Sequence, residues 1–475
     1  MNIKKGSELN LDIETLAFGG RGVAKVDSLV VFVDGALPGQ QVIAKIIRKR
    51  KDYAEARALG VVKESLEAVE PRCPYFGECG GCLLQNLEYM AQLKYKRQQI
   101  GESLQHLGGF KSPPVLDTLP SPEQYYYRNK MEYSFGPQRW LSAYEIEHNE
   151  ILKPKNFALG LHVRGRFNKI LDIDACYLQS PRSVEILNFV RQFALDCEIP
   201  PYSTQDHSGF WRHLVVREGK NTGQTMVNIV TADAPEFFNV VEQLAVRLTE
   251  KFPDLTTIVH SINRKKAQIA IGDEVRVLFG SGSIKERIGS RMFQISANSF
   301  FQTNTNGAEL LYEKIVEFAE FKVDEIVYDL YSGAGTISLY IANHVQQVVG
   351  FELVENAVRD SEINCQLNGT KNCVFVQGDL KDALAMKAEL FEKWGKPDTI
   401  IIDPPRAGMH VKVLTQVLKI RPNKIVYVSC NPATFARDAK ELCQSQYELK
   451  NVQPVDMFPM TPHIELVSLL KRIGA

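Results

Sequence analysis

The stretch IVYDLYSGAG, residues 326–335, decides the fold of the C-terminal part of the chain. Its first residues predict a buried strand, and Gly333 and Gly335 then allow a tight turn into a helix. Further apolar runs follow, with room for helices between them: VVGFE (348–352), CVFVQGD (373–379) and DTIIIDPPR (398–406). Strands that alternate with helices predict a doubly wound α/β sheet of Rossmann type.

Acidic residues end several of these strands, where a parallel sheet binds its ligands. Glu352 closes the second strand and can bond ribose hydroxyls, and Asp379 closes the third. A dinucleotide fingerprint would place a third glycine at position 338, where this chain has Ser338. Gln302, in FFQTN, precedes the first strand and can bond the methionine part of a cofactor. Together these features favour S-adenosylmethionine over a dinucleotide.

A thiol follows the next predicted strand, in IVYVSCNPATF (425–435). As a thiolate, Cys430 could add to C6 of uracil and make C5 nucleophilic toward a methyl group. A base must then remove the C5 proton, and Glu465 directly precedes the apolar run of the last expected strand. Taken alone, Cys430 would be interpreted as a small buried apolar residue, so its catalytic role depends on the cofactor and the base.

The whole chain has 475 residues, which suggests roughly three domains. The formal net charge is zero, so any surface that binds nucleic acid must be local. No signal peptide or membrane span is evident, and we expect a cytoplasmic monomer with no membrane or protein partner. Nine cysteines in a reducing compartment indicate metal binding or catalysis rather than disulfides.

The first 66 residues alternate short apolar runs with glycine turns, which predicts a small OB-like β-barrel. Six cations accompany Tyr53 within thirteen residues: Lys45, Arg48, Lys49, Arg50, Lys51 and Arg57. Such a stripe could contact RNA phosphates while the ring stacks on a base. A solvated edge strand rich in lysine is the alternative interpretation.

Three cysteines have the spacing C-x5-C-x2-C within residues 71–85: Cys73, Cys79 and Cys82. Adjacent glycines between them let the backbone fold tightly, so the sulfurs can converge. A fourth ligand could be Cys176 or Cys197. Three closely spaced cysteines plus one remote cysteine favour a cubane iron–sulfur cluster. Zinc, the first alternative, is usually bound by two pairs of closely spaced ligands, and unligated thiols are the second alternative.

The central region predicts a helix over residues 86–107, a linker over 112–122, and then mostly strands with one helix, Pro181 to Asp196. Four segments there mix aromatic and cationic residues: YYYRNKMEYSF (125–135), HVRGRFNKI (162–170), FWRHLVVRE (210–218) and INRKK (262–266). This mixture suits splayed, single-stranded RNA. Each segment alone would also fit an ordinary amphipathic sheet.

Several motifs resemble those of known RNA-modifying enzymes. FGGRGVAKVDSLVVFVDGALPGQ (18–40) is similar to the TRAM domain, an RNA-binding barrel. SCNPATFARD (429–438) resembles the nucleophile motif, and FPMTPHIE (458–465) the base motif, of RNA 5-methyluridine methyltransferases of the 23S rRNA type. That family also uses the C-x5-C-x2-C spacing, whereas radical methylthiotransferases, which carry TRAM too, use C-x3-C-x2-C. The resemblance covers nearly the whole chain.

The resemblance implies methyl transfer from S-adenosylmethionine to C5 of a uridine in 23S rRNA, with Cys430 as nucleophile and Glu465 as base. It places cofactor contacts at Gln302, Tyr331, Thr336, Glu352, Asp379 and Asp403. It assigns a [4Fe-4S] cluster to Cys73, Cys79, Cys82 and Cys176. The implied domains are a TRAM domain (1–66), a central RNA-binding domain with the cluster (67–298) and a class I methyltransferase domain (299–475).

Two departures from the family pattern and several alternatives accompany this prediction. Thr336 stands where many members have Asn, and Asp403-Pro404-Pro405 replaces the commoner Asp-Pro-Ala. A tRNA uridine-C5 methyltransferase is one alternative, and a non-catalytic RNA-binding or chaperone protein is another. A cytosine-C5 enzyme would have Cys where this chain has Arg406, and an amino-methylating enzyme needs no Cys430. The TRAM and cysteine motifs favour large-subunit rRNA, with the target uridine left open.

Overall fold

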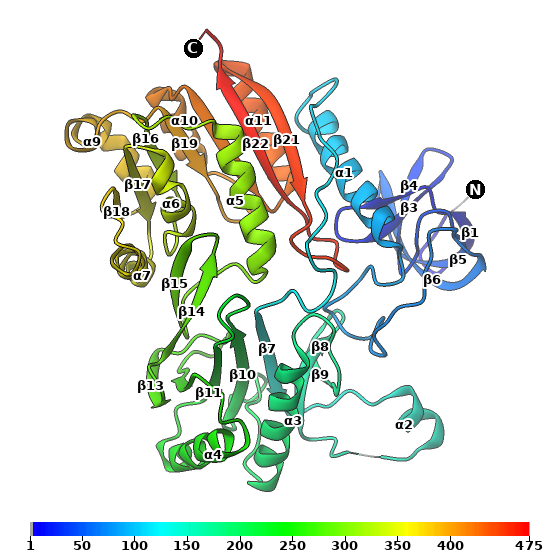
Figure 1. Ribbon diagram of the computed structural model, residues 1–475. Helices are drawn as coiled ribbons and strands as arrows, with labels where there is room; N and C mark the ends of the chain where they lie inside the picture. The colour runs from blue at the N-terminus through cyan, green and yellow to red at the C-terminus, as the bar shows by residue number, and fades with distance from the viewer. Residues whose placement is uncertain (1–2, 152, 475) are drawn as a thin grey trace.

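Three large β-sheets and one separate hairpin organise the chain (Figure 1). The computed structural model describes residues 3–151 and 153–474. In Figure 1 the C-terminal sheet lies above the central sheet, and the N-terminal sheet lies to the right of both. Over the described ranges, every helix is too short or too polar to cross a membrane.

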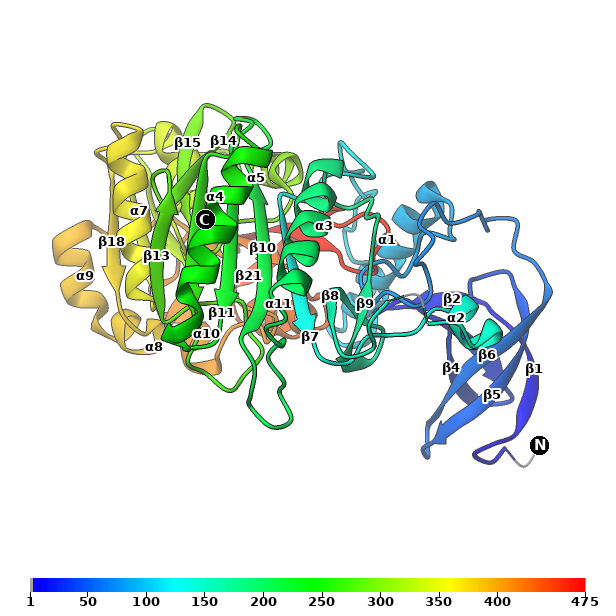
Figure 2. The same ribbon diagram turned by 90° about the horizontal axis from the view of Figure 1, so that it is seen from below.

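The N-terminal sheet has the strand order β1-β5-β6-β4-β3-β2 and curls on itself in Figure 2. Its strands are β1 (Glu8–Asp12), β2 (Thr15–Ala17), β3 (Arg21–Val26), β4 (Leu29–Asp34), β5 (Gln41–Lys49) and β6 (Tyr53–Lys63). Along β5, Val42, Ala44 and Ile46 are buried and the residues between them face outward, as the two-residue period of a strand requires. The predicted cations of this region are all exposed.

The central sheet is mixed and has the order β13-β12-β11-β10-β7-β8-β9. Its strands are β7 (Lys130–Gly136), β8 (Ala158–Val163), β9 (Arg166–Asp172), β10 (Trp211–Glu218), β11 (Thr225–Thr231), β12 (Thr257–Ile262) and β13 (Glu274–Phe279). The helices are α2 (Ala143–His148), α3 (Pro181–Asp196) and α4 (Phe238–Lys251). The helices α3 and α4 share one apolar core with a face of this sheet.

The expectation of a single helix in this region was wrong, because α4 is a second long one. Its apolar residues recur at helical spacing and are buried: Phe238, Val241, Leu244, Ala245 and Leu248. The pattern was therefore present in the sequence.

The C-terminal sheet has the order β18-β17-β16-β19-β20-β22-β21. Its strands are β16 (Ile326–Leu330), β17 (Gln347–Glu352), β18 (Cys373–Gln377), β19 (Thr399–Ile402), β20 (Lys424–Ser429), β21 (Tyr447–Val455) and β22 (Glu465–Arg472). Strands β16 to β20 are parallel, and β22 runs antiparallel between β20 and β21. The prediction of a doubly wound α/β sheet is confirmed.

Helices cover both faces of this sheet (Figure 1). They are α5 (Thr305–Ala319), α6 (Thr336–Ile341), α7 (Glu355–Leu367), α8 (Leu380–Ala383), α9 (Lys387–Trp394), α10 (Val411–Ile420) and α11 (Pro432–Ser445). Strand order reverses at β16, which lies between β17 and β19. In open α/β sheets, ligands bind in the crevice at this reversal, outside the carboxyl ends of the strands.

The hairpin of β14 (Ser283–Ile288) and β15 (Arg291–Ser296) joins the two larger sheets. Ile284 and Phe293 lie in the same apolar core as α5 and β16, and Met226 of the central sheet belongs to that core too. The central and C-terminal sheets are therefore packed against one another through buried side chains.

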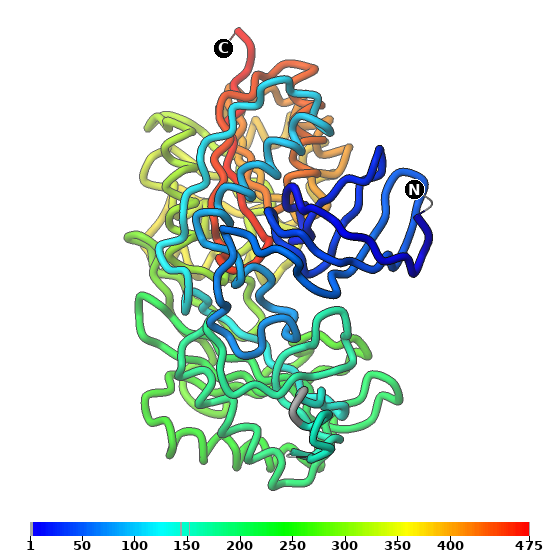
Figure 3. The backbone as a smooth tube through the Cα atoms, turned by 90° about the vertical axis from the view of Figure 1, so that its right-hand side faces the viewer, coloured from blue at the N-terminus to red at the C-terminus, as the bar shows by residue number. Residues whose placement is uncertain are grey.

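The helix predicted over residues 86–107 is confirmed as α1 (Tyr89–His106), which packs against α11 and β21. The predicted linker after it has a second role. Val115 and Leu119 form parallel bridges with Val452 and Val455, so this segment runs along the edge of β21 (Figure 3). It thereby covers an open sheet edge whose backbone groups would otherwise be exposed.

Candidate active site and cysteine pocket

Strands β20 and β22 bring the two predicted catalytic residues together. Ser429 pairs with Leu466, and the same antiparallel register continued by one residue places Cys430 opposite Glu465. Residues directly opposite in antiparallel strands point to the same face, with Cβ atoms roughly 4.5–5.5 Å apart. Because β21 pairs with β22 on the other side, Glu465 is only 9% exposed.

The turn after β20 holds Cys430 at the carboxyl end of the strand. Asn431 caps α11, since its side-chain oxygen accepts a hydrogen bond from the Ala433 N–H at 3.1 Å. Pro432 occupies the first turn of the helix, where its missing N–H costs nothing. The side-chain amide of Asn431 donates to the Arg406 carbonyl at 2.9 Å, which ties this turn to the loop after β19.

Burial controls the charge of both groups. It raises the pKa of Glu465 well above its usual range, and the neighbouring Asp403 carboxyl raises it further. Burial likewise raises the pKa of the Cys430 thiol to about 11, and the charge of Glu465 adds to this rise. The Arg406 guanidinium lowers both pKa values. The charge of Glu465 therefore makes ionisation of Cys430 harder, and Arg406 makes ionisation of both groups easier.

Arg406 is exposed, and its guanidinium approaches a neutral partner. Its Nη2 lies 3.3 Å from Nδ1 of His463. Burial, helped by the nearby Arg406 charge, lowers the pKa of His463 to about 4, so the ring is uncharged at neutral pH. His463 therefore adds no second positive charge beside Arg406, whose own charge lowers the pKa values of Cys430 and Glu465.

The glycine turn after β16 is fixed by Glu352. Its carboxylate accepts hydrogen bonds from the N–H groups of Gly333 at 2.9 Å and Val354 at 2.8 Å. Gly335 has a φ of 75°, and a Cβ there would lie within 3.0 Å of Phe375, Ser361 and Leu339 side chains. Tyr331 has a φ of 66°, which is uncommon for a residue other than glycine and marks a strained turn.

The remaining predicted cofactor residues lie around the same strand ends. Asp403 follows β19 and is half-buried, and burial raises its pKa to about 6. Thr336 begins α6 and accepts a hydrogen bond from the Tyr312 hydroxyl at 2.9 Å. Asp379 caps α8 and forms a 2.8 Å ion pair with Lys381. Gln302 lies in the loop before α5, apart in sequence from the other five.

Two features of the site were not predicted. The Ser338 hydroxyl donates to Asp329 at 2.5 Å, and burial raises the pKa of Asp329 to about 7. The serine that breaks the dinucleotide fingerprint thus satisfies a buried acid. The second feature is a junction at Asn304 and Asn129, both buried.

The junction joins three parts of the chain. Asn129 donates to the Gln302 carbonyl at 2.8 Å and to the Thr305 hydroxyl at 2.9 Å. Asn304 caps α5 and donates to the Met457 carbonyl at 3.0 Å. The loop that carries Gln302 is therefore tied both to the central sheet and to the segment leading to Glu465. The helix-capping pattern Asn304-Thr305 could have revealed part of this from the sequence.

The structure gathers the four predicted cluster ligands in one pocket. Its lining includes Cys73, Cys79, Cys82 and Cys176, with apolar neighbours such as Leu161 and Ile173, and excludes Cys197. Burial raises the pKa of Cys79 to about 11 and that of Cys82 to about 12, and the Cys176 charge raises both further.

Backbone donors point at the sulfurs of this pocket. The Gly81 N–H lies 3.4 Å from the Cys79 sulfur. The amides of Tyr75 and Phe76 bond Cys73, and those of Leu178 and Gln179 bond Cys176. Such donors stabilise thiolates, as a soft metal site requires. Among the described residues, no three His, Cys, Asp or Glu side chains are placed to hold a single metal ion.

Comparisons with known proteins agree with the two ends of the chain. Residues 3–59 match the TRAM domain family. Residues 242–473 match the family described as tRNA (Uracil-5-)-methyltransferase. The prediction of a TRAM domain is thereby confirmed.

Full-length relatives extend this similarity. An uncharacterized RNA methyltransferase of Chlorobaculum tepidum is 44% identical over 99% of this chain and 97% of its own length. One of Nitratidesulfovibrio vulgaris is 39% identical over 98% of this chain and 96% of its own. The crystal structure of Pyrococcus abyssi tRNA (uracil-54, C5)-methyltransferase with S-adenosyl-L-homocysteine is 30% identical, with a TM-score of 0.74 over 97% of this chain and all of that one. The chain therefore belongs to the family of S-adenosylmethionine-dependent RNA (uracil-5-)methyltransferases.

Proposed function

We propose that this protein transfers a methyl group from S-adenosylmethionine to C5 of a uridine in RNA, with Cys430 as nucleophile and Glu465 as base. The observation that carries the assignment is the pairing of Ser429 with Leu466, the neighbours of Cys430 and Glu465 in the chain. Strands β20 and β22 lie on the β19 side of the strand-order reversal, and Cys430 follows the carboxyl end of β20.

The residues divide the chemistry between them. The Cys430 thiolate adds to C6 of uracil, which places negative charge on C5 and O4. The cofactor, when bound, supplies the methyl group that C5 attacks. Glu465 then takes the C5 proton, the C5–C6 double bond re-forms and the Cys430 thiolate leaves. Burial makes Glu465 a stronger base than an ordinary carboxylate, because its pKa is raised.

Arg406 is the proposed stabiliser of negative charge in this reaction. It lowers the pKa values of both Cys430 and Glu465. A cation at that position also favours the enolate formed when the thiolate adds.

The cofactor would lie across the ends of β16 to β19. We assign its contacts to Gln302, Tyr331, Thr336, Glu352, Asp379 and Asp403. Glu352, which closes β17, suits the ribose hydroxyls, and Asp379 suits the adenine amino group. The turn at Gly335 has no room for a side chain, because a Cβ there would meet Phe375, Ser361 and Leu339, so glycine lets this turn pack closely at the proposed cofactor site.

For the cysteine pocket we propose a [4Fe-4S] cluster on Cys73, Cys79, Cys82 and Cys176. In a cubane each thiolate binds a different iron, so the sulfurs stand farther apart than around one zinc ion. The ligand residues come from two distant segments, which gives the cluster a structural role. Protein purified without oxygen should contain iron and inorganic sulfide in a ratio near that of the cubane. Stoichiometric zinc without iron would reject the assignment.

Large-subunit 23S rRNA is the proposed substrate, supported by the combination of the TRAM domain with the cysteine pocket. The name of the Pyrococcus abyssi enzyme favours tRNA as the second candidate. Mapping 5-methyluridine in rRNA and tRNA from a strain that lacks this protein separates the two. Loss from tRNA alone would reject the rRNA assignment.

The nucleophile is tested by covalent trapping. RNA that contains 5-fluorouridine has no C5 proton to release, so wild-type protein should accumulate a stable adduct with it. Cys430→Ala should abolish both this adduct and methylation. Cys443→Ala is the matched control, because it removes another half-buried thiol, from α11. An adduct that persists in Cys430→Ala would disprove the assignment.

A further inference from the structure

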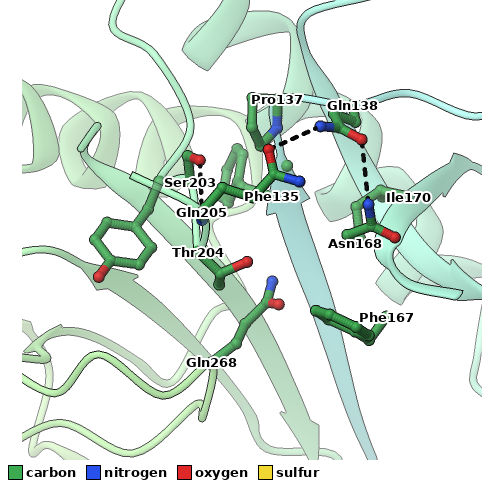
Figure 4. A pocket seen from close by; sticks show the side chains of 12 residues that line it. Phe135, Pro137, Gln138, Phe167, Asn168, Ile170, Ser203, Thr204, Gln205 and Gln268 are labelled. Carbon is green, nitrogen blue, oxygen red and sulfur yellow. Dashed lines mark hydrogen bonds between the residues drawn. The ribbon is translucent and has the colours of Figure 1, made fainter. Parts of the chain in front are cut away.

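Two of the four segments that mix aromatic and cationic residues, 125–135 and 162–170, line one pocket of the central sheet (Figure 4). Phe135 comes from β7, and Phe167 and Asn168 come from β9. Gln268 lies in the loop after β12, directly beyond the cationic INRKK segment. The segment 210–218 contributes Arg212 of β10, which does not line the pocket but contacts the lining residue Tyr202. Residues that are far apart in the sequence therefore lie around the same pocket.

Arg212 fixes the loops that form the pocket. It is 2% exposed, and its guanidinium stacks 4.1 Å from the ring centre of Tyr202, a lining residue. The same guanidinium donates to the carbonyls of Lys265 at 2.7 Å and Ala267 at 2.6 Å. The loop before β10 and the loop after β12 are thereby held against each other.

The lining is rich in side-chain amides. Asn168 donates to Gln138 at 3.3 Å, and Gln138 donates to Gln205 at 3.3 Å. In Figure 4, Gln268 points into the hollow between Thr204 and Phe167. An amide carries two donors and an acceptor with two lone pairs, so these groups keep unused capacity for a ligand.

An aromatic ring stands at the mouth of the pocket. Phe167 is 75% exposed, although Phe is usually buried. Exposed cations occur in the same two segments of the sheet, with Arg166 next to Phe167 on β9, and Lys265 and Lys266 shortly before Gln268 on the loop after β12. A ring for stacking, amides for base edges and cations for phosphates are the groups that recognise unpaired nucleotides.

We propose that the exposed ring of Phe167, at the mouth of this pocket, stacks on an unpaired nucleobase of the substrate RNA, at a position remote from the uridine that is methylated. The inference rests on the proposed function, because it takes RNA as the substrate. Strand β7 begins at Lys130, next to the junction with the Gln302 loop, and ends at Gly136 in the pocket. Six strand steps span roughly 20 Å, so the base recognised lies several nucleotides from the target.

The test compares two exposed phenylalanines on opposite edges of one sheet. Phe167 is on β9 at one edge, and Phe279, 40% exposed, is on β13 at the other. Transcripts of 23S rRNA and of tRNA serve as probes in affinity measurements on the full-length protein. Phe167→Ala should weaken binding of the substrate RNA roughly 5- to 150-fold, the range for a lost base stack. Phe279→Ala should leave it unchanged, and Phe167→Trp should retain it.

A second readout separates this inference from the proposed function. A five-nucleotide RNA centred on 5-fluorouridine is too short to reach both sites, so its adduct should form equally in wild type and Phe167→Ala. If wild type forms no adduct with any RNA, the proposed function fails, while the comparison of affinities still decides the role of the pocket. Equal affinities of Phe167→Ala and wild type for both transcripts, or equal losses in both alanine variants, would overturn the pocket's role.

Discussion

At the scale of single residues, the pair of Cys430 and Glu465 shows how one ionisable group sets the reactivity of another. Burial alone would keep the thiol protonated at neutral pH, and the adjacent carboxylate raises its pKa further, to about 11. Arg406 acts in the opposite direction. Cys430, the proposed nucleophile, is therefore mostly protonated at neutral pH, and a protonated thiol is alkylated and oxidised more slowly than a thiolate.

Glu465→Gln should make Cys430 more reactive, although it removes the proposed base. The change deletes the negative charge beside the thiol, so the thiol pKa falls below about 11 and more thiolate exists at any pH under that value. We expect Cys430 alkylation at pH 9 to rise between about twofold and tenfold, since a full pKa unit corresponds to tenfold. Mass spectrometry of peptides alkylated with iodoacetamide over pH 7–11 measures this.

Cys443 is the internal control for that experiment. Burial raises its pKa to about 11 as well, and the carboxylate near it is Glu448, not Glu465. Its alkylation profile should be the same in both proteins. An unchanged Cys430 profile in Glu465→Gln would show that the two side chains do not interact.

At the scale of elements, α1 is fastened to the C-terminal sheet by a buried ion pair. Lys96 Nζ lies 2.6 Å from Asp456 Oδ1, and the two side chains are 1% and 0% exposed. Burial lowers the pKa of Lys96, and Asp456 opposes this. Compared with a well-packed pair of apolar residues, such an ion pair contributes little net stability. Replacing only one of its two residues, however, leaves the other charge buried without a partner.

Lys96→Met should therefore destabilise the protein by about 3–5 kcal/mol, the usual cost of an unpaired buried charge. The double variant Lys96→Met/Asp456→Leu should recover part of that loss. Unfolding in urea, followed by a signal from the C-terminal sheet, measures the change in the free energy of unfolding. Lys94→Met on the same helix is the control, because its pair with Glu67 is 60% and 32% exposed and is worth about 1 kcal/mol or less. Equal losses in both single variants would contradict the argument.

Elements were predictable where the signal is local. The α/β alternation after residue 326 and the helix α1 follow from periodicity, and α4 was missed although its apolar spacing is regular. The bridge of Val115 to Val452 could not be predicted, because it depends on the edge of a sheet formed by residues far away. The same holds for the junction at Asn129 and Asn304, where each residue is unremarkable by itself.

At the scale of the whole molecule, the candidate site depends on contacts that only the fold creates. The sequence motifs indicated Cys430 and Glu465 separately, and only the pairing of β20 with β22 brings their neighbours Ser429 and Leu466 together. Motifs likewise predicted four segments that contact RNA, without indicating that two of them line one pocket. The spacing of residues in the sequence could indicate the chemistry of their side chains. Which of these side chains lie close together in space depends on how the sheets form.

The N-terminal sheet and helix α9 lie on opposite sides of the molecule in Figure 1, and both regions carry exposed cations, which allows a charge test of RNA binding. The slope of log affinity against log salt concentration should become shallower by up to roughly 2 when Lys49, Arg50 and Lys51 are replaced with Gln. Each contact with a phosphate of single-stranded RNA contributes about 0.7 to this slope. Replacing exposed Lys371, Lys393 and Lys396 at the opposite end should leave the slope unchanged. Identical slopes in all three proteins would place RNA elsewhere.

Strand β22 is last in chain order among the described strands, yet it lies between β20 and β21. During synthesis, β20 therefore waits with an unpaired edge until every other strand of its sheet exists. The proposed base enters only with this final insertion, so no partly made chain can carry out the reaction. Cys430 and Glu465 can therefore act together only when the other strands of the sheet are already in place.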